Sequence, residues 1–163
     1  MRRLLLTLPL LAQMASSQQP PRGPGGPDPG FPYAQLLRAV DEKVSLLLDQ
    51  GKTDAAIEEL KRIPALNVPR DHPVYEGKAH LWSRLAMTYL NAGRKKEALE
   101  TIKALLEEVP PGTVAEASAW LQAGTLYKQA GLPDDALKAF DRAIALSDRL
   151  VKDQPRPRPA PHP

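Results

Sequence analysis

Apolar residues recur every three to four positions through the middle of the chain, with polar residues between them. That spacing places the apolar side chains on one face of an α-helix. The pattern therefore predicts an all-α fold. The six expected helices span about 33–50, 54–63, 74–91, 97–109, 114–130 and 133–151.

Residues suited to helix termini stand at several of these boundaries. Thr53 or Asp54 is expected to cap the second helix and Thr113 the fifth, because their side chains accept backbone N–H bonds. Pro133 suits the first turn of the last helix, where a missing N–H costs nothing.

Three glycine turns share one register in the sequence. They read GKTDAAIEEL from Gly51, GRKKEALETI from Gly93 and GLPDDALKAF from Gly131. In each turn, four residues separate the glycine from an alanine and an aliphatic residue, and Leu, Ile or Phe follows three positions later. Glycine takes the left-handed conformation that often closes a helix. The repetition predicts three copies of one helical hairpin.

The second and third copies resemble the tetratricopeptide repeat in their pattern of large and small residues. The residues that carry the resemblance are Trp82, Leu85, Ala86, Tyr89, Gly93, Ala98, Ile102 and Pro110 in the second copy, and Trp120, Ala123, Gly124, Tyr127, Gly131, Ala136, Phe140 and Ala143 in the third. The first copy keeps Val40, Val44, Leu47, Gly51, Ala56 and Leu60 but lacks the aromatic residues.

This resemblance implies a right-handed superhelix of three antiparallel helical hairpins. The repeats would lie at about 33–66, 74–110 and 113–151. Their glycine turns lie 42 and 38 residues apart, against roughly 34 in the family. Because the extra residues fall in loops, the pairing of the helices can survive them.

Large aromatic residues in the pattern are expected to fill the space that small residues leave between helices. One hairpin cannot bury its own apolar face, so neighbouring hairpins must stack. We therefore expect Trp82 and Trp120 to lie in the core, where truncation of either to Ala would cost roughly 3–5 kcal/mol.

Residues 1–17 have the composition of a secretory signal peptide, with an Arg2-Arg3 pair, a short apolar run and small residues at the end. The run is shorter than a membrane span and contains Pro9. Cleavage before Gln18 would place the mature protein in the periplasm or outside the cell. The alternative is that this segment is a buried helix of the domain.

Two segments rich in proline flank the helical domain, which is expected at 33–152. Residues 18–32 read QQPPRGPGGPDPGFP, and residues 153–163 end in QPRPRPAPHP. Neither composition can build a packed core, so we expect a disordered linker and a disordered tail. The tail favours extended polyproline conformations.

Composition and charge narrow the classes of partner. The chain has 22 Lys and Arg against 19 Asp and Glu, a net charge of +3 that falls to +1 if Arg2 and Arg3 leave with the leader. A nearly neutral surface is poorly suited to nucleic acid. The absence of cysteine excludes disulfides and thiolate metal sites, and in an exported chain it favours a bacterial periplasm.

The sequence contains no recognisable catalytic motif. No second ligand stands at metal-binding spacing from His72, His80 or His162. The GPGG segment lacks the Lys and Ser or Thr of a phosphate-binding loop. We therefore expect no metal, no cofactor and no enzymatic activity.

In the resembled family, the first helix of each pair lines a concave groove that binds a protein or peptide. The second copy would supply His80, Ser83, Arg84, Met87 and Asn91, and the third Leu121, Gln122, Thr125, Lys128 and Gln129. The first copy would add Asp41, Ser45, Leu48 and Asp49. Alternatively, these residues are only solvated helix faces. Some family members clamp a C-terminal carboxylate with Lys and Asn, and the acidic Asp41 and short Ser45 argue against such a clamp here.

The last expected helix keeps an apolar stripe but is followed only by the tail. The stripe consists of Leu137, Phe140, Ile144, Leu150 and Val151. An uncovered apolar face favours a second copy of the chain or a partner. The sequence thus indicates an exported scaffold that binds a protein or peptide in its groove. The alternatives are an oligomerising structural subunit of an envelope or secretion assembly, or an accessory subunit of a separate enzyme.

Overall fold

The computed structural model describes residues 28–154, which form six α-helices. The helices are α1 (Phe31–Asp49), α2 (Thr53–Lys61), α3 (Tyr75–Asn91), α4 (Lys95–Glu108), α5 (Val114–Gln129) and α6 (Pro133–Asp153). Helix α1 begins two residues before the expected boundary, so Phe31 and Pro32 belong to the helix. The expected leader at 1–17, most of the linker and most of the tail lie outside the described residues.

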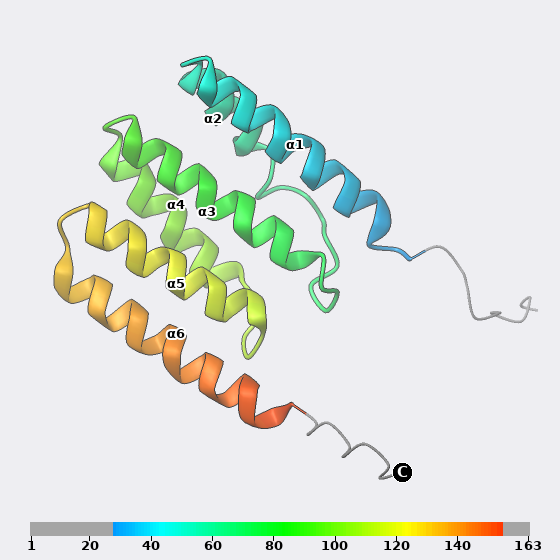
Figure 1. Cartoon of the computed structure of the whole chain (residues 1–163), viewed down its shortest axis with the longest axis vertical. Helices are drawn as coiled ribbons and strands as arrows, with labels where there is room; N and C mark the ends of the chain where they lie inside the picture. Colours follow the sequence, from blue (N-terminus) through cyan, green and yellow to red (C-terminus); the bar gives the residue numbers. More distant parts are fainter. Residues whose placement is uncertain (1–27, 155–163) are drawn as a thin grey trace, which may run out of the picture.

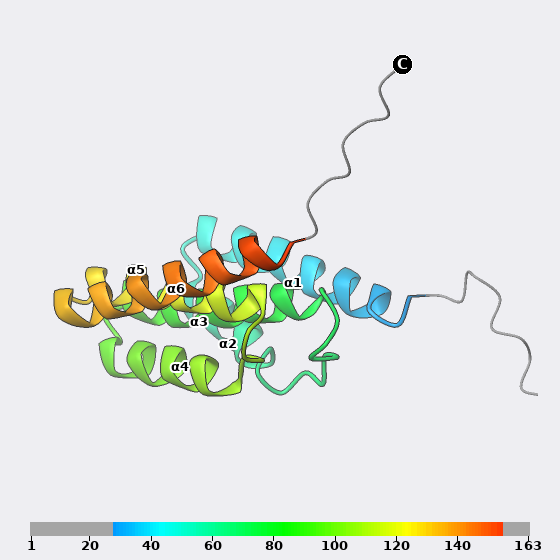
Figure 2. The ribbon, with the colours of Figure 1, turned by 90° about the horizontal axis from the view of Figure 1, so that it is seen from below.

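The helices form three antiparallel hairpins stacked in chain order, as the sequence predicts (Figure 1). Helix α3 packs against α1 and α2, and α5 packs in the same way against α3 and α4. In Figure 2, α2 and α4 lie on the same side of the row formed by α1, α3 and α5. Helix α6 ends the stack and, among the described helices, contacts only α5.

The three glycine turns have the predicted left-handed backbone, with φ of +71° at Gly51, +75° at Gly93 and +74° at Gly131. In the first turn, Gly51 N–H donates to Leu48 C=O and Lys52 N–H donates to Leu47 C=O. The same pair of bonds closes the other two turns. These bonds satisfy carbonyls that the helix end would otherwise leave unpaired.

The two predictions about helix caps have different outcomes. Thr113 caps α5 as predicted, because its Oγ1 accepts a hydrogen bond from Glu116 N–H at 3.2 Å. The prediction of a Thr53 or Asp54 side-chain cap on α2 is wrong. Helix α2 begins at Thr53 itself, and Lys52 at the cap position makes no side-chain cap bond. The glycine turn already fixes the entry of the chain into α2.

Small residues let the helices approach closely, and large residues fill the space between them. A Cβ on Gly124 would lie only 2.6 Å from the Phe140 ring, so this glycine allows α6 to pack tightly on α5. Trp82 is buried in the core as predicted. Trp120 is only partly buried at the edge of the core, where its indole N–H donates to Glu116 Oε1 at 3.4 Å. The prediction of a core position for Trp120 is therefore right in part.

The long connection between α2 and α3 is tied to α3 by a buried lysine. Lys78 Nζ donates to Leu66 C=O at 2.9 Å and lies 5.5 Å and 5.4 Å from the ring centroids of Tyr75 and Trp82. Burial lowers the pKa of Lys78. The lysine therefore fixes the loop that leads into the second hairpin.

Over residues 28–154, none of the helices combines the length and the apolar character that a membrane crossing requires.

Candidate binding groove

Two adjoining hollows lie on the face formed by α1, α3 and α5. One, of about 340 Å³, lies between α1 and α3, and the other, of about 370 Å³, lies between α3 and α5. Gly77 and His80 line both. We call the combined surface the helix-row groove, and it crosses all three repeats without interruption.

The depth of the helix-row groove follows from small residues on α3. A Cβ on Gly77 would lie 3.2 Å from Leu37 Cδ1, so a larger residue would fill the space between α1 and α3. Ala79 and Ser83 are buried on the side of α3 that faces α5. Short side chains here keep the helices close and leave the neighbouring polar residues at the rim.

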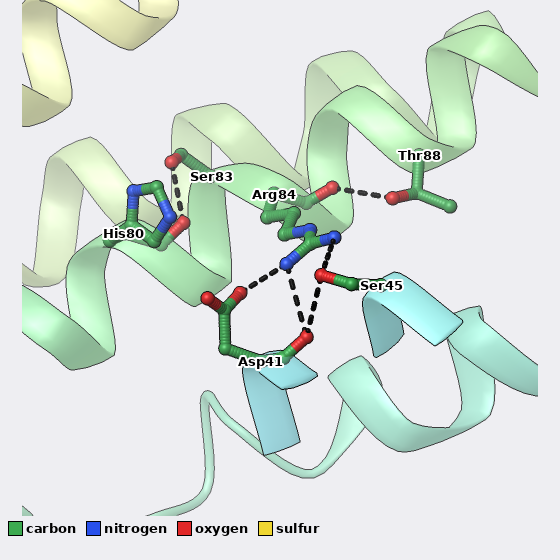
Figure 3. Close-up of polar contacts among 6 residues, drawn as sticks. All are labelled: Asp41, Ser45, His80, Ser83, Arg84 and Thr88. Carbon is green, nitrogen blue, oxygen red and sulfur yellow. Dashed lines mark hydrogen bonds and ion pairs between the residues drawn. The ribbon is translucent and has the colours of Figure 1, made fainter. Parts of the chain in front are cut away.

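Charged and polar side chains of both signs surround the helix-row groove. Arg38 on α1 and Glu76 on α3 are exposed at its rim, with His80 between the two hollows. Ser83 Oγ donates to His80 C=O at 2.7 Å, as Figure 3 shows. Gln122 on α5 is half-buried and faces the second hollow. The groove can therefore donate and accept hydrogen bonds along its length.

Four of the predicted groove residues, Asp41, His80, Ser83 and Gln122, line the helix-row groove. Arg84 instead bonds to α1, where it forms an ion pair with the Asp41 carboxylate and donates to Ser45 Oγ at 3.0 Å (Figure 3). A further bond runs from Arg84 Nη1 to Asp41 C=O at 3.3 Å. These contacts join the first repeat to the second.

The remaining predicted residues lie beside the helix-row groove or toward the other ends of the helices. Met87 and Leu48 are half-buried against the core, and the Thr125 hydroxyl donates to Leu121 C=O at 3.2 Å. Four exposed residues at the ends of α1, α3 and α5 line neither hollow, namely Asp49, Asn91, Lys128 and Gln129.

The sequence-based prediction missed most of the residues that line the helix-row groove, among them Arg38, Glu76, Gly77 and Ser118. A signal for two of them was present, because Arg38 and Ser118 stand as far before their turn glycines as His80 stands before Gly93. Counting back from the turns would have placed these three residues on one face. Glu76 precedes His80 by one helical turn, and that position lies outside the predicted groove.

Among residues 28–154, no three His, Asp or Glu residues come together as a set that could hold a metal ion.

Comparison with known proteins assigns the helical region to a repeat family. Two models described as tetratricopeptide repeat match residues 42–113 and 117–149. The crystal structure of MamA is similar at 27% sequence identity and a TM-score of 0.50, over 71% of this chain and 61% of that chain. The chain thus spans less than two thirds of MamA's length. No curated protein sequence matches.

Proposed function

Because the chain belongs to the tetratricopeptide repeat family, we propose that it is an exported scaffold that binds a protein or peptide in the helix-row groove. The family and the fold support a role in protein–protein interaction. We choose the helix-row groove as the binding surface because its two hollows are continuous, since Gly77 and His80 line both.

The chemistry of the helix-row groove suggests the kind of segment that it binds. Arg38 and Glu76 provide opposite charges, and His80, Ser118 and Gln122 provide neutral polar groups. A groove with this lining favours an extended or helical peptide of mixed polarity over a strongly charged one. Because Arg84 is bonded to Asp41 and Ser45, its role in this proposal is to hold α1 against α3, and it does not contact the bound peptide.

Site-specific photo-crosslinking in the native host tests this proposal. The photoreactive residue benzoylphenylalanine would replace His80 or Gln122, with replacement of Lys103 on the exposed side of α4 as the control. We expect one polypeptide to be crosslinked from both groove positions and not from position 103. Equal crosslinking from all three positions, or none from the groove, would reject the helix-row groove as the binding surface.

The proposal of export rests on the segment 1–17, in which basic, apolar and small residues follow in the order of a signal peptide. We expect protein purified from the envelope of its host to begin at Gln18. N-terminal sequencing and fractionation of the cells measure this. A cytoplasmic protein that retains Met1 would contradict export and would leave the proposed binding surface untouched.

A further inference from the structure

A third hollow lies at the end of the stack between α5 and α6 and shares only Ser118 with the helix-row groove. Its volume is about 620 Å³. The lining is largely apolar and exposed, with 50% of Leu121, 59% of Ile144 and 68% of Val151 accessible to solvent. We call this surface the end groove.

The end groove is lined by the repeat positions that, in the first two repeats, lie against the first helix of the next repeat. These positions stand at the same four offsets before each turn glycine. They are Ala34, Leu37, Arg38 and Asp41 on α1, Glu76, Ala79, His80 and Ser83 on α3, and Val114, Ala117, Ser118 and Leu121 on α5. On α1 they border α3, and on α3 they border α5. On α5 they border no further helix of the described chain.

The second helix of each hairpin repeats this correspondence. Ile102 and Leu105 on α4 are fully buried, and α5 packs against their helix. Their counterparts on α6, at the same offsets after the turn glycine, are Phe140 and Ala143, which line the end groove. One position further on, Leu106 packs against the core, whereas its counterpart Ile144 is exposed.

The end groove therefore has the arrangement of residues that packs against one more helix. Residues 155–163 are not suited to supply that helix, because every second residue from Pro155 to Pro163 is proline and proline disrupts an α-helix. A segment that binds in the end groove must have apolar residues at helical spacing along one face.

Charge along the edge of the end groove restricts the occupant further. Asp134, Asp141 and Asp148 recur at a heptad interval on α6, next to the apolar stripe, and Asp148 lines the groove. Within residues 28–154, none of the three forms an ion pair. The opposite edge, at Ser118, is neutral. Lys138 lies further round the helix and pairs with Asp135 at 3.9 Å.

The same acidic row argues against a second copy of this chain as the occupant. If two α6 helices paired in antiparallel orientation through their apolar stripes, their aspartate rows would face each other. Like charges in such positions destabilise a helix pair. A basic edge on a different protein would instead be attracted.

We propose that the end groove binds an amphipathic helix of a partner protein, with an apolar stripe that meets Leu121, Ile144 and Val151 and with Lys or Arg along one edge that meets Asp141 and Asp148. The bound helix takes the place that α3 and α5 occupy on the preceding hairpins. This surface acts independently of the helix-row groove.

Fluorescence anisotropy of the full-length chain with designed peptides tests the proposal. The probe is a labelled helical peptide of roughly 18 residues, or five turns, with leucine at positions i, i+3 and i+7 and lysine beside them. Its control has glutamate in place of lysine. We expect the basic peptide to bind at least about tenfold more tightly than the acidic one, which corresponds to about 1.4 kcal/mol.

Variants of exposed residues locate the binding without disturbing the fold. We expect Leu121→Asp and Ile144→Asp each to weaken binding of the basic peptide at least about tenfold. The double variant D141K/D148K should reverse the preference toward the acidic peptide. The matched controls Lys103→Asp on α4 and His80→Ala in the helix-row groove should leave the affinity unchanged.

Several results would overturn the proposal. These are equal affinity for the two peptides, binding that is insensitive to Leu121→Asp and Ile144→Asp, or competition between the peptide and a dimer seen by analytical ultracentrifugation. A gain in affinity of about tenfold on deletion of residues 155–163 would also overturn it, because it would identify the tail as the occupant. Circular dichroism of each variant confirms that it is folded.

Discussion

At the scale of single residues, Glu116 joins three parts of the last hairpin through one buried carboxylate. Gly112 N–H donates to its Oε2 at 2.6 Å, and Arg142 on α6 and Trp120 on α5 approach its Oε1 at 3.1 Å and 3.4 Å. Burial by itself would raise the pKa of Glu116, but the hydrogen bonds from Gly112, Arg142 and Trp120 outweigh it and lower the pKa below its ordinary value. The ionised form is therefore the one that holds α6 to the start of α5.

This network makes the stability of the domain depend on pH. The pKa of Glu116 is lower in the folded state than in the unfolded state. The ionised carboxylate therefore contributes fully to the free energy of unfolding above the unfolded-state pKa, and this contribution is lost as the pH falls through the folded-state pKa. We expect Glu116→Gln to lower the free energy of unfolding by roughly 1–3 kcal/mol at neutral pH. The difference from wild type should shrink below about pH 4. Urea unfolding at several pH values measures it.

The exposed Glu107 on α4 provides the control for this experiment, since it lies 3.9 Å from Lys103 in a solvent-exposed pair. Glu107→Gln should change the free energy of unfolding by less than about 0.5 kcal/mol at any of these pH values. If Glu116→Gln behaved in the same way, the carboxylate would not hold α5 and α6 together.

At the scale of the helix, the sequence predicts the elements well because each one carries local signals. Apolar spacing indicates the faces, and the turn glycines indicate the ends, whose φ values of +71° to +75° only glycine adopts readily. The cap of α2 could not be predicted, because the geometry of the preceding turn, and not a side chain, fixes that helix start. Trp120 has the same repeat position as Trp82 but lies at the open end of the stack, where no further hairpin of the described chain covers it.

The contacts between helices were harder to predict than the helices themselves. Repeat position predicts that Arg84 faces the groove, but it does not show that Asp41 and Ser45 lie opposite and bind the guanidinium. Asn91 and Lys128 lie on the same helices as the groove residues, yet the hollows follow the other halves of these helices. Which half is hollow depends on small residues such as Gly77, whose effect appears only when two helices are packed together.

At the scale of the whole molecule, stacking produces two surfaces of different chemistry. The helix-row groove crosses all three repeats and has charged and neutral polar side chains among its lining residues, whereas the end groove has large exposed apolar side chains with an acidic edge and lies at one end of the stack. Both surfaces arise in the same way. The first helix of each hairpin has one face that borders the next hairpin in the stack. Where a hairpin follows, a hollow remains between neighbouring first helices, and at the last hairpin no helix of residues 28–154 covers the apolar face. If both proposals hold, the scaffold would bind two partners at once.

The affinity of the crosslinked partner for two matched variants tests the central claim most directly. One variant, R38A/H80A/Q122A, removes polar side chains of the helix-row groove, and the other, K96A/K103A, removes exposed side chains of α4. Alanine favours the helix in both, so the fold should persist. We predict that the groove variant binds the partner at least about tenfold more weakly than wild type while the α4 variant binds normally. Equal affinity of the two variants, with unchanged circular dichroism, would contradict the account.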